Sequence, residues 1–201
     1  MRPSCFRLIL PVVLLLGATI VPSRGTERRE WVTLTNCQLV ASDYNDGDSF
    51  RIRGGTNEFI VRLYFVDAPE TNLHYAERTR EQAEYFGITL DETLKAGAQA
   101  RDAVRELLRE PFVVQTRWAS AAGRSKTPRY YCFVKVGGES LAEVLVARGL
   151  ARTKGVTATL PDGGKSKIFA EKLQALEAEA RQKRLGAWTT APGKKLEAPT
   201  Q

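Results

Sequence analysis

The chain has 201 residues, of which 43% are hydrophobic and 26% are charged, and its formal net charge is +7. This is an ordinary globular composition without repeats or low-complexity tracts, which excludes a repeat protein and a largely disordered one. The length favours one domain with extensions. The basic balance favours polyanionic partners without proving them, because many exported proteins are basic.

Residues 1–25 have the features of a signal peptide. Arg2 and Arg7 form a positively charged start, and residues 8–21 form an interrupted apolar run that is too short to span a membrane comfortably. We therefore expect a secreted or periplasmic protein whose folded domain occupies residues 26–188. The alternative is an uncleaved N-terminal anchor that holds the domain outside the membrane.

A β-hairpin is predicted after a first strand at residues 31–42. The Asp46-Gly47-Asp48 sequence is typical of a turn, because glycine readily adopts the positive φ of tight turns. Residues 50–53 and 59–66 alternate like two strands joined by a second glycine turn. Asp48 then stands at the start of one strand and Asp67 at the end of its neighbour, so we expect their carboxylates to meet at one edge.

Two neighbouring carboxylates suit a hard cation such as Ca²⁺ or Mg²⁺, which prefers oxygen ligands. The bend at Asp67-Ala68-Pro69 would let the Ala68 carbonyl face the same cation. Arg62 lies five residues before Asp67, on the opposite face of a regular strand unless a bulge or the barrel's twist intervenes. A cation, a guanidinium and the carboxylate of Glu70 would suit phosphodiester cleavage, because positive groups offset phosphoryl charge and a carboxylate accepts a proton from water.

Two helices are predicted after the hairpin. Residues 75–86 carry helix-forming residues with apolar side chains at helical spacing. Thr89 and Glu92 resemble the start of a second helix over residues 91–109. His74, the one histidine of the chain, is interpreted as a solvated loop residue and not as a ligand.

Two further strands and a short helix follow. Residues 112–118 and 129–136 alternate like strands around a loop of small and basic residues. Ser140 and Glu143 have the spacing of a capping box, which predicts a short helix ending at Gly149. Short strands with helices between and after them predict an α+β fold, in which helices pack on a small β-barrel.

The C-terminal part predicts one more helix and a tail. Residues 165–184 are strongly charged, and the residues placed on one apolar side are Ile168, Phe169, Leu173, Leu176 and Ala180. Residues 189–201 contain two prolines and are interpreted as a disordered tail.

Two cysteines, Cys37 and Cys132, lie in strand-like runs of the predicted barrel. They could form a disulfide in an oxidising compartment or remain as two buried thiols. The sequence does not give their separation, so both possibilities stay open.

The order of these motifs resembles that of the staphylococcal (micrococcal) nuclease family. The resemblance runs from about Val32 to Trp188 and rests on Asp46-Gly47-Asp48-Ser49, Arg62, Asp67-Ala68-Pro69-Glu70, Arg129, residues 140–145, residues 148–151 and Gly186-Ala187-Trp188. Each motif alone is weakly specific, whereas the ordered set is fairly specific. It implies a five-stranded barrel of the oligonucleotide-binding type with three main helices, to which this chain adds a helical insertion after the first hairpin.

The resemblance also implies roles for particular residues. The implied Ca²⁺ ligands are Asp48, Asp67 and the carbonyl oxygen of Ala68, with Asp46 acting through water. The implied catalytic residues are Arg62 and Arg129, whose guanidinium groups would bind phosphate, and Glu70, which would orient or deprotonate the attacking water.

The sequence departs from the family at the nucleotide pocket. Two tyrosines of the family correspond here to Gly155 and Thr157, and the tyrosine that often precedes the second arginine is also missing. Because bases stack on aromatic rings, either substrate binding is weaker or other rings substitute, such as Tyr75, Tyr85 and Tyr130.

These observations predict an exported, Ca²⁺-dependent nuclease that cuts DNA, RNA or both with low sequence specificity. The resemblance implies mainly endonucleolytic cleavage that leaves 3′-phosphates. We expect a monomer without an obligate protein partner. The alternatives are a non-catalytic nucleic-acid-binding module with the same fold and, in third place, a cell-envelope interaction domain that uses the inserted helices.

Overall fold

The computed structural model describes residues 29–121 and 127–189. The predicted signal peptide or anchor at residues 1–25 lies outside these residues, as does the predicted tail beyond Thr189. None of the helices in the described ranges is long and apolar enough to cross a membrane.

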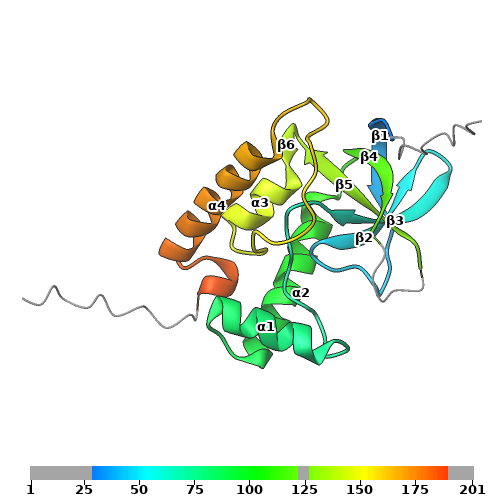
Figure 1. Ribbon diagram of the computed structural model, residues 1–201. Coiled ribbons are helices and arrows are strands. Elements are labelled where there is room, and N and C mark those ends of the chain that lie inside the picture. Colours follow the sequence, from blue (N-terminus) through cyan, green and yellow to red (C-terminus); the bar gives the residue numbers. More distant parts are fainter. Residues whose placement is uncertain (1–28, 122–126, 190–201) are drawn as a thin grey trace, which may run out of the picture.

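A closed β-barrel forms one half of the molecule (Figure 1). Its strands are β1 (Val32–Leu39), β2 (Ser49–Gly54), β3 (Asn57–Leu63), β4 (Phe112–Ser120) and β5 (Arg129–Val136). A two-residue strand, β6 (Glu139–Ser140), pairs with β5 in antiparallel orientation. Neighbouring strands follow the order β3-β2-β1-β4-β5-β6, and β3 also pairs in parallel with β5, which closes the sheet. The prediction of a five-stranded barrel in an α+β fold is confirmed.

The strands form because their side chains alternate between the barrel interior and its surface. In β2, Phe50 and Ile52 are fully buried, whereas Arg53 points to solvent. Val61 and Leu63 of β3 fill the same interior. Burying each of these apolar side chains contributes about 1.5–3 kcal/mol to folding.

The hairpin register places Arg62 next to the first acidic turn. Arg62 pairs with Ser49 across β2 and β3, and the Leu63 N–H donates to the Asp48 carbonyl at 2.8 Å. The end of β3 is therefore tied to the residues just before β2. This is the edge at which the sequence predicts the two carboxylates to meet.

Four α-helices cover the barrel (Figure 1). They are α1 (Ala76–Phe86), α2 (Leu90–Leu107), α3 (Leu141–Ala147) and α4 (Ser166–Gln182), followed by a short 3₁₀ helix η1 (Gly186–Trp188). Helices α1 and α2 lie at one end of the barrel, and α3 and α4 pack together along its side. The predicted insertion is α1, and α2 begins at the expected place, where Thr89 and Glu92 form a capping box.

Two details of the predicted helices are wrong. Ser140 pairs with Lys135 in the β5–β6 ladder and its side chain makes no capping hydrogen bond, while Glu143 forms an ion pair with Lys172 of α4. Ile168 was expected on the apolar side of α4 but is exposed, because it lies outside the face that packs on the barrel.

Cys37 and Cys132 are both fully buried and both free. Burial raises the pKa of each thiol, so both remain protonated near neutral pH. Of the two possibilities left open by the sequence, the structure shows the buried thiols.

Gly97 lets α2 approach the segment that carries the predicted cation ligands. A Cβ atom at this position would lie 2.3 Å from the backbone oxygen of Glu70 and 2.7 Å from that of Pro69. Backbone atoms cannot give way as a flexible side chain can, so only glycine fits here.

We expect Gly97→Ala to lower the free energy of unfolding by about 1–3 kcal/mol, because it overpacks this contact. Alanine normally stabilises a helix relative to glycine by about 1 kcal/mol, so the expected sign is opposite to that of helix propensity. Urea denaturation measures the difference, with Gln99→Ala at an exposed position of α2 as the control. An unchanged or higher stability of Gly97→Ala would contradict the close contact.

Candidate active site

The turn before β2 holds two carboxylates in fixed positions. The Asp46 Oδ1 atom accepts hydrogen bonds from the N–H groups of Asp48 and Ser49, at 3.1 and 2.6 Å. Asp48 is 2% exposed, and its Oδ2 accepts the Ala68 N–H at 3.1 Å. Burial, together with the nearby Asp48 carboxylate, raises the pKa of Asp46. The hydrogen bond between Asp48 and the Ala68 N–H ties this turn to the segment that follows β3.

The chain after β3 is irregular, and this explains how Arg62 can face the same side as Asp67 although a regular strand would place them on opposite faces. The sequence predicts a strand through Val66, but β3 ends at Leu63 and Phe65 adopts a φ of 69°. The strand alternation is broken before Asp67, which instead pairs with Arg152 through two backbone hydrogen bonds of 3.0 and 2.9 Å. Because of this break, Arg62 and Asp67 face the same side.

Arg62 joins the two predicted carboxylate ligands. One of its terminal nitrogens, Nη2, lies 2.9 Å from Asp48 Oδ2 and 3.3 Å from Asp67 Oδ1. The Asp48 carboxylate raises the pKa of Arg62, so the guanidinium stays charged. The structure thus brings the two carboxylates together at one edge of the hairpin, as the sequence predicts, and places Arg62 between them.

Asp67 is surrounded by more cationic groups than the sequence suggests. Its Oδ1 contacts Arg62 and also forms an ion pair with Arg78 of α1. Its Oδ2 accepts from Arg152 Nε at 2.8 Å and from Gln82 at 3.1 Å. One carboxylate therefore contacts three guanidinium groups and one amide.

Gln82 of α1 fixes the backbone of the acidic segment. It is fully buried, donates to the Ala68 carbonyl at 2.9 Å and accepts the Glu70 N–H at 2.8 Å. Together with its bond to Asp67, these contacts use both N–H groups and the oxygen of the amide. The inserted helix is thus built into the site.

Arg152 also connects the acidic segment after β3 to α1. Its side chain is 1% exposed, binds Asp67, and makes two hydrogen bonds of 3.1 Å to Glu81. Its guanidinium also lies over the Tyr85 ring, 5.0 Å from the ring centroid. Tyr85, a candidate for stacking on a nucleotide base, instead donates to Glu177 of α4.

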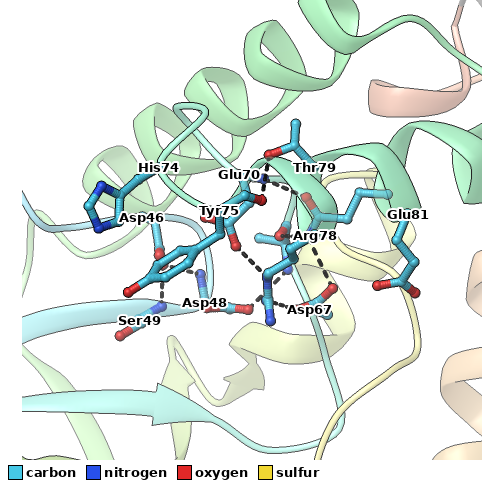
Figure 2. Close-up of polar contacts among 12 residues, drawn as sticks. Asp46, Asp48, Ser49, Asp67, Glu70, His74, Tyr75, Arg78, Thr79 and Glu81 are labelled. Atoms are coloured by element: carbon cyan, nitrogen blue, oxygen red, sulfur yellow. Dashed lines mark hydrogen bonds and ion pairs between the residues drawn. The ribbon is translucent and has the colours of Figure 1, made fainter. Parts of the chain in front are cut away.

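Glu70 points toward Arg78, and Figure 2 shows the two side chains meeting beside Asp67. Burial raises the pKa of Glu70, and the ion pair with Arg78 opposes that shift. A carboxylate with a raised pKa is a better proton acceptor near neutral pH than an ordinary one. This shift of the pKa is in the direction that the predicted role of Glu70 requires.

A pocket of about 710 Å³ opens next to these groups. Arg62, Asp67, Glu70 and Arg129 all line it, so the predicted catalytic residues share one cavity. The buried Nε of Arg129 has no hydrogen-bond partner among the described residues. A buried charged donor without a partner is costly, and an anionic ligand in this pocket would satisfy it.

The tyrosines that could substitute for the missing tyrosines of the family do not all lie at the pocket. Tyr75 and Asp46 line the same pocket, and the exposed His74 packs edge-on against the Tyr75 ring, with 4.8 Å between the ring centroids. Tyr130 packs against Trp118 instead. Gly155 also lines the pocket with a φ of 146°, and a Cβ there would lie 3.1 Å from the Val66 oxygen, so a tyrosine would require the backbone to move.

The predicted cation ligands suit a hard cation. Asp48 and Asp67 direct oxygens at the same Arg62 nitrogen, so their oxygens converge on a position that already holds positive charge. Across residues 29–121 and 127–189, no group of three or more Asp, Glu, His or Cys side chains could hold a metal ion by itself. The predicted set contains two carboxylates and the Ala68 carbonyl, which keeps a second lone pair beside its bond to Gln82. These are oxygen ligands of the type that Ca²⁺ binds, and water or substrate oxygens would have to complete the coordination.

Three residues of this site were missed by the sequence analysis: Arg78, Gln82 and Arg152. The first two lie four positions apart on the predicted helix 75–86, and their shared face was a usable signal. Arg152 lies in an irregular segment, where no periodicity indicates the direction of its side chain.

Comparison with protein-family models gives one match. The family described as staphylococcal nuclease homologue matches residues 60–190. This range includes the second half of β3, both predicted arginines, the Asp67–Glu70 segment and all four helices. A search of curated proteins finds no match for the chain.

Proposed function

Because the chain belongs to the family of staphylococcal nuclease homologues, we propose that it is a Ca²⁺-dependent phosphodiesterase that hydrolyses DNA, RNA or both. We further propose that cleavage is mainly endonucleolytic, has low sequence specificity and leaves 3′-phosphates. The proposed catalytic residues are Arg62, Glu70 and Arg129. The proposed cation ligands are Asp48, Asp67 and the Ala68 carbonyl.

The observation that carries this proposal is the pocket in which two arginines and a carboxylate meet. Arg62 and Arg129 supply guanidinium groups for a phosphodiester, and the buried Nε of Arg129 has no hydrogen-bond partner among the described residues. Glu70 lies in the same cavity as a proton acceptor.

The proposed reaction follows from these groups. Glu70 accepts a proton from water as the water oxygen bonds to phosphorus, and the bond from phosphorus to the 5′-oxygen breaks. The 5′-oxygen leaves with the electron pair and takes a proton from solvent, which gives a 5′-hydroxyl and a 3′-phosphate. Negative charge grows on the two non-bridging oxygens, where Arg62 and Arg129 bind most strongly in the transition state. Bound Ca²⁺ would supply further positive charge at these oxygens.

Export of the protein is part of the proposal. The sequence of residues 1–25 supports it, since a positively charged start and a short apolar run are typical of a signal peptide. An extracellular or periplasmic location would also suit a Ca²⁺-dependent enzyme. We propose that the protein acts there as a monomer.

We expect Glu70→Gln to lower kcat by about 10²–10⁴-fold, because glutamine cannot accept the proton. Affinity for a nucleic acid should change little, since Glu70 makes no attractive contact with phosphate. Single-turnover cleavage and fluorescence-anisotropy binding of the same labelled oligonucleotide measure the two effects. Glu77→Gln, at an exposed residue that lines the same pocket, is the control. Near-normal turnover of Glu70→Gln would reject the assigned role.

The second candidate function is nucleic-acid binding without cleavage. It is favoured by the saturation of Asp67 with three guanidinium groups and one amide, and by glycine at the position of a family tyrosine. Binding by the wild-type chain without any Ca²⁺-dependent cleavage would establish this alternative.

A further inference from the structure

The inserted helix α1 places a positive charge against the predicted cation ligands. Arg78 forms ion pairs with Asp67 through Nη2 and with Glu70 through Nε. Figure 2 shows its side chain reaching between these two carboxylates from the helix. A single guanidinium thus spans one proposed cation ligand and the proposed base.

Arg78 is the most exposed of the three arginines that contact Asp67. Arg152 is 1% exposed and is also held by Glu81, and Arg62 is 15% exposed and is also held by Asp48. The Arg78 side chain is 36% exposed and extends along the pocket wall. Its exposure gives it room to turn from Asp67 into the pocket, whereas Arg152, which also lines the pocket, is almost fully buried and is held by Glu81 as well.

The charges at this site oppose the entry of a second cation. A divalent ion that binds Asp67 would stand within a few ångströms of three guanidinium groups, and like charges at such distances repel strongly in a partly buried site. Moving Arg78 aside removes one of these repulsions. It also removes one of the two guanidinium contacts of Asp67 Oδ1 and frees the contacted Glu70 oxygen for the entering ion and its water.

We infer that Arg78 is a built-in cation of this site, which a divalent metal ion must displace from Asp67 and Glu70 in order to bind. This inference rests on the proposed function in one respect, because it takes Asp67 as a cation ligand. It goes beyond that function by assigning a role to the inserted helix. The helix sets the metal affinity of the site through one guanidinium group.

The test is calorimetric titration of CaCl₂ into the purified mature chain and its variants. Removing the charge in Arg78→Gln should lower the Kd for Ca²⁺ at least tenfold, and Arg78→Met, a second neutral variant, should do the same. Arg78→Lys keeps the charge and should bind more weakly than either neutral variant. Arg80→Gln, at an exposed position of the same helix, should match the wild type.

The rise in melting temperature caused by Ca²⁺ provides a second readout that does not depend on activity. It should be larger for Arg78→Gln than for the wild type. Equal Kd values and equal rises in melting temperature would overturn the inference and leave the proposed nuclease intact, provided that the wild type still cleaves with Ca²⁺. Absence of Ca²⁺ binding in the wild type and in both neutral variants would overturn the inference and the proposed metal site together.

Discussion

Replacing Arg62 with glutamine is expected to lower kcat by about 10²–10³-fold, the usual cost of removing one charged or polar group that stabilises the transition state. Arg62 is held by Asp48 and Asp67 with its guanidinium in the pocket, so it is positioned before substrate arrives. The charge on the phosphoryl oxygens grows during the reaction. The loss should therefore be larger in kcat than in substrate affinity.

The control for this prediction is Arg53→Gln in the neighbouring strand β2. Arg53 also forms an ion pair with a carboxylate, that of Glu58, but its side chain is half exposed on the barrel surface. Both variants lose one arginine from the same hairpin, and only Arg62 lines the pocket. Circular dichroism must show that both are folded. If Arg62→Gln then cleaves as fast as Arg53→Gln, Arg62 has no role in catalysis.

Replacing Arg152 with alanine should lower the free energy of unfolding by about 3–5 kcal/mol, the typical cost of removing one partner of a buried ion pair. The change leaves the buried Asp67 with one guanidinium fewer and removes both hydrogen bonds to Glu81. It also removes the contact of the guanidinium with the Tyr85 ring. Urea denaturation of the wild type and the variant measures the difference.

Lys154 provides a matched comparison, because it binds the same Glu81 carboxylate from the same segment. Its side chain is 54% exposed, so Lys154→Ala should cost less than about 1 kcal/mol. Both side chains bind the same Glu81 carboxylate, so we expect the larger loss of stability in Arg152→Ala to come from the burial of the Arg152 side chain. Equal losses of stability would contradict the buried network around Asp67.

The barrel could be predicted from the sequence because each strand carries its own alternation. Phe50 and Ile52 point inward as their positions require, and the acidic turn before them contains the Asp-Gly step that turns favour. These are local signals, and they agree with the fold. Ser140 is the N-cap residue of α3, but the predicted capping box is absent because its side chain makes no capping hydrogen bond and Glu143 pairs with Lys172 of α4.

The candidate site was predictable only in part. The meeting of Asp48 with Asp67 follows from hairpin geometry, but the approach of Arg62 to Asp67 depends on one irregular residue, Phe65, which no pattern indicates. The contacts of Arg152 join residues that are 85 and 71 positions apart. Such contacts are set by packing between distant segments, which local sequence patterns do not specify.

The most direct test of the nuclease assignment is cleavage of single-stranded DNA, double-stranded DNA and RNA by the purified mature chain, with excess Ca²⁺ and with a chelator. We predict hydrolysis of at least one of these substrates with Ca²⁺, loss of that activity on chelation and its return when Ca²⁺ is restored. Equal rates with and without the chelator would contradict the metal role. Failure to cleave any substrate with Ca²⁺ present would contradict the proposed activity itself.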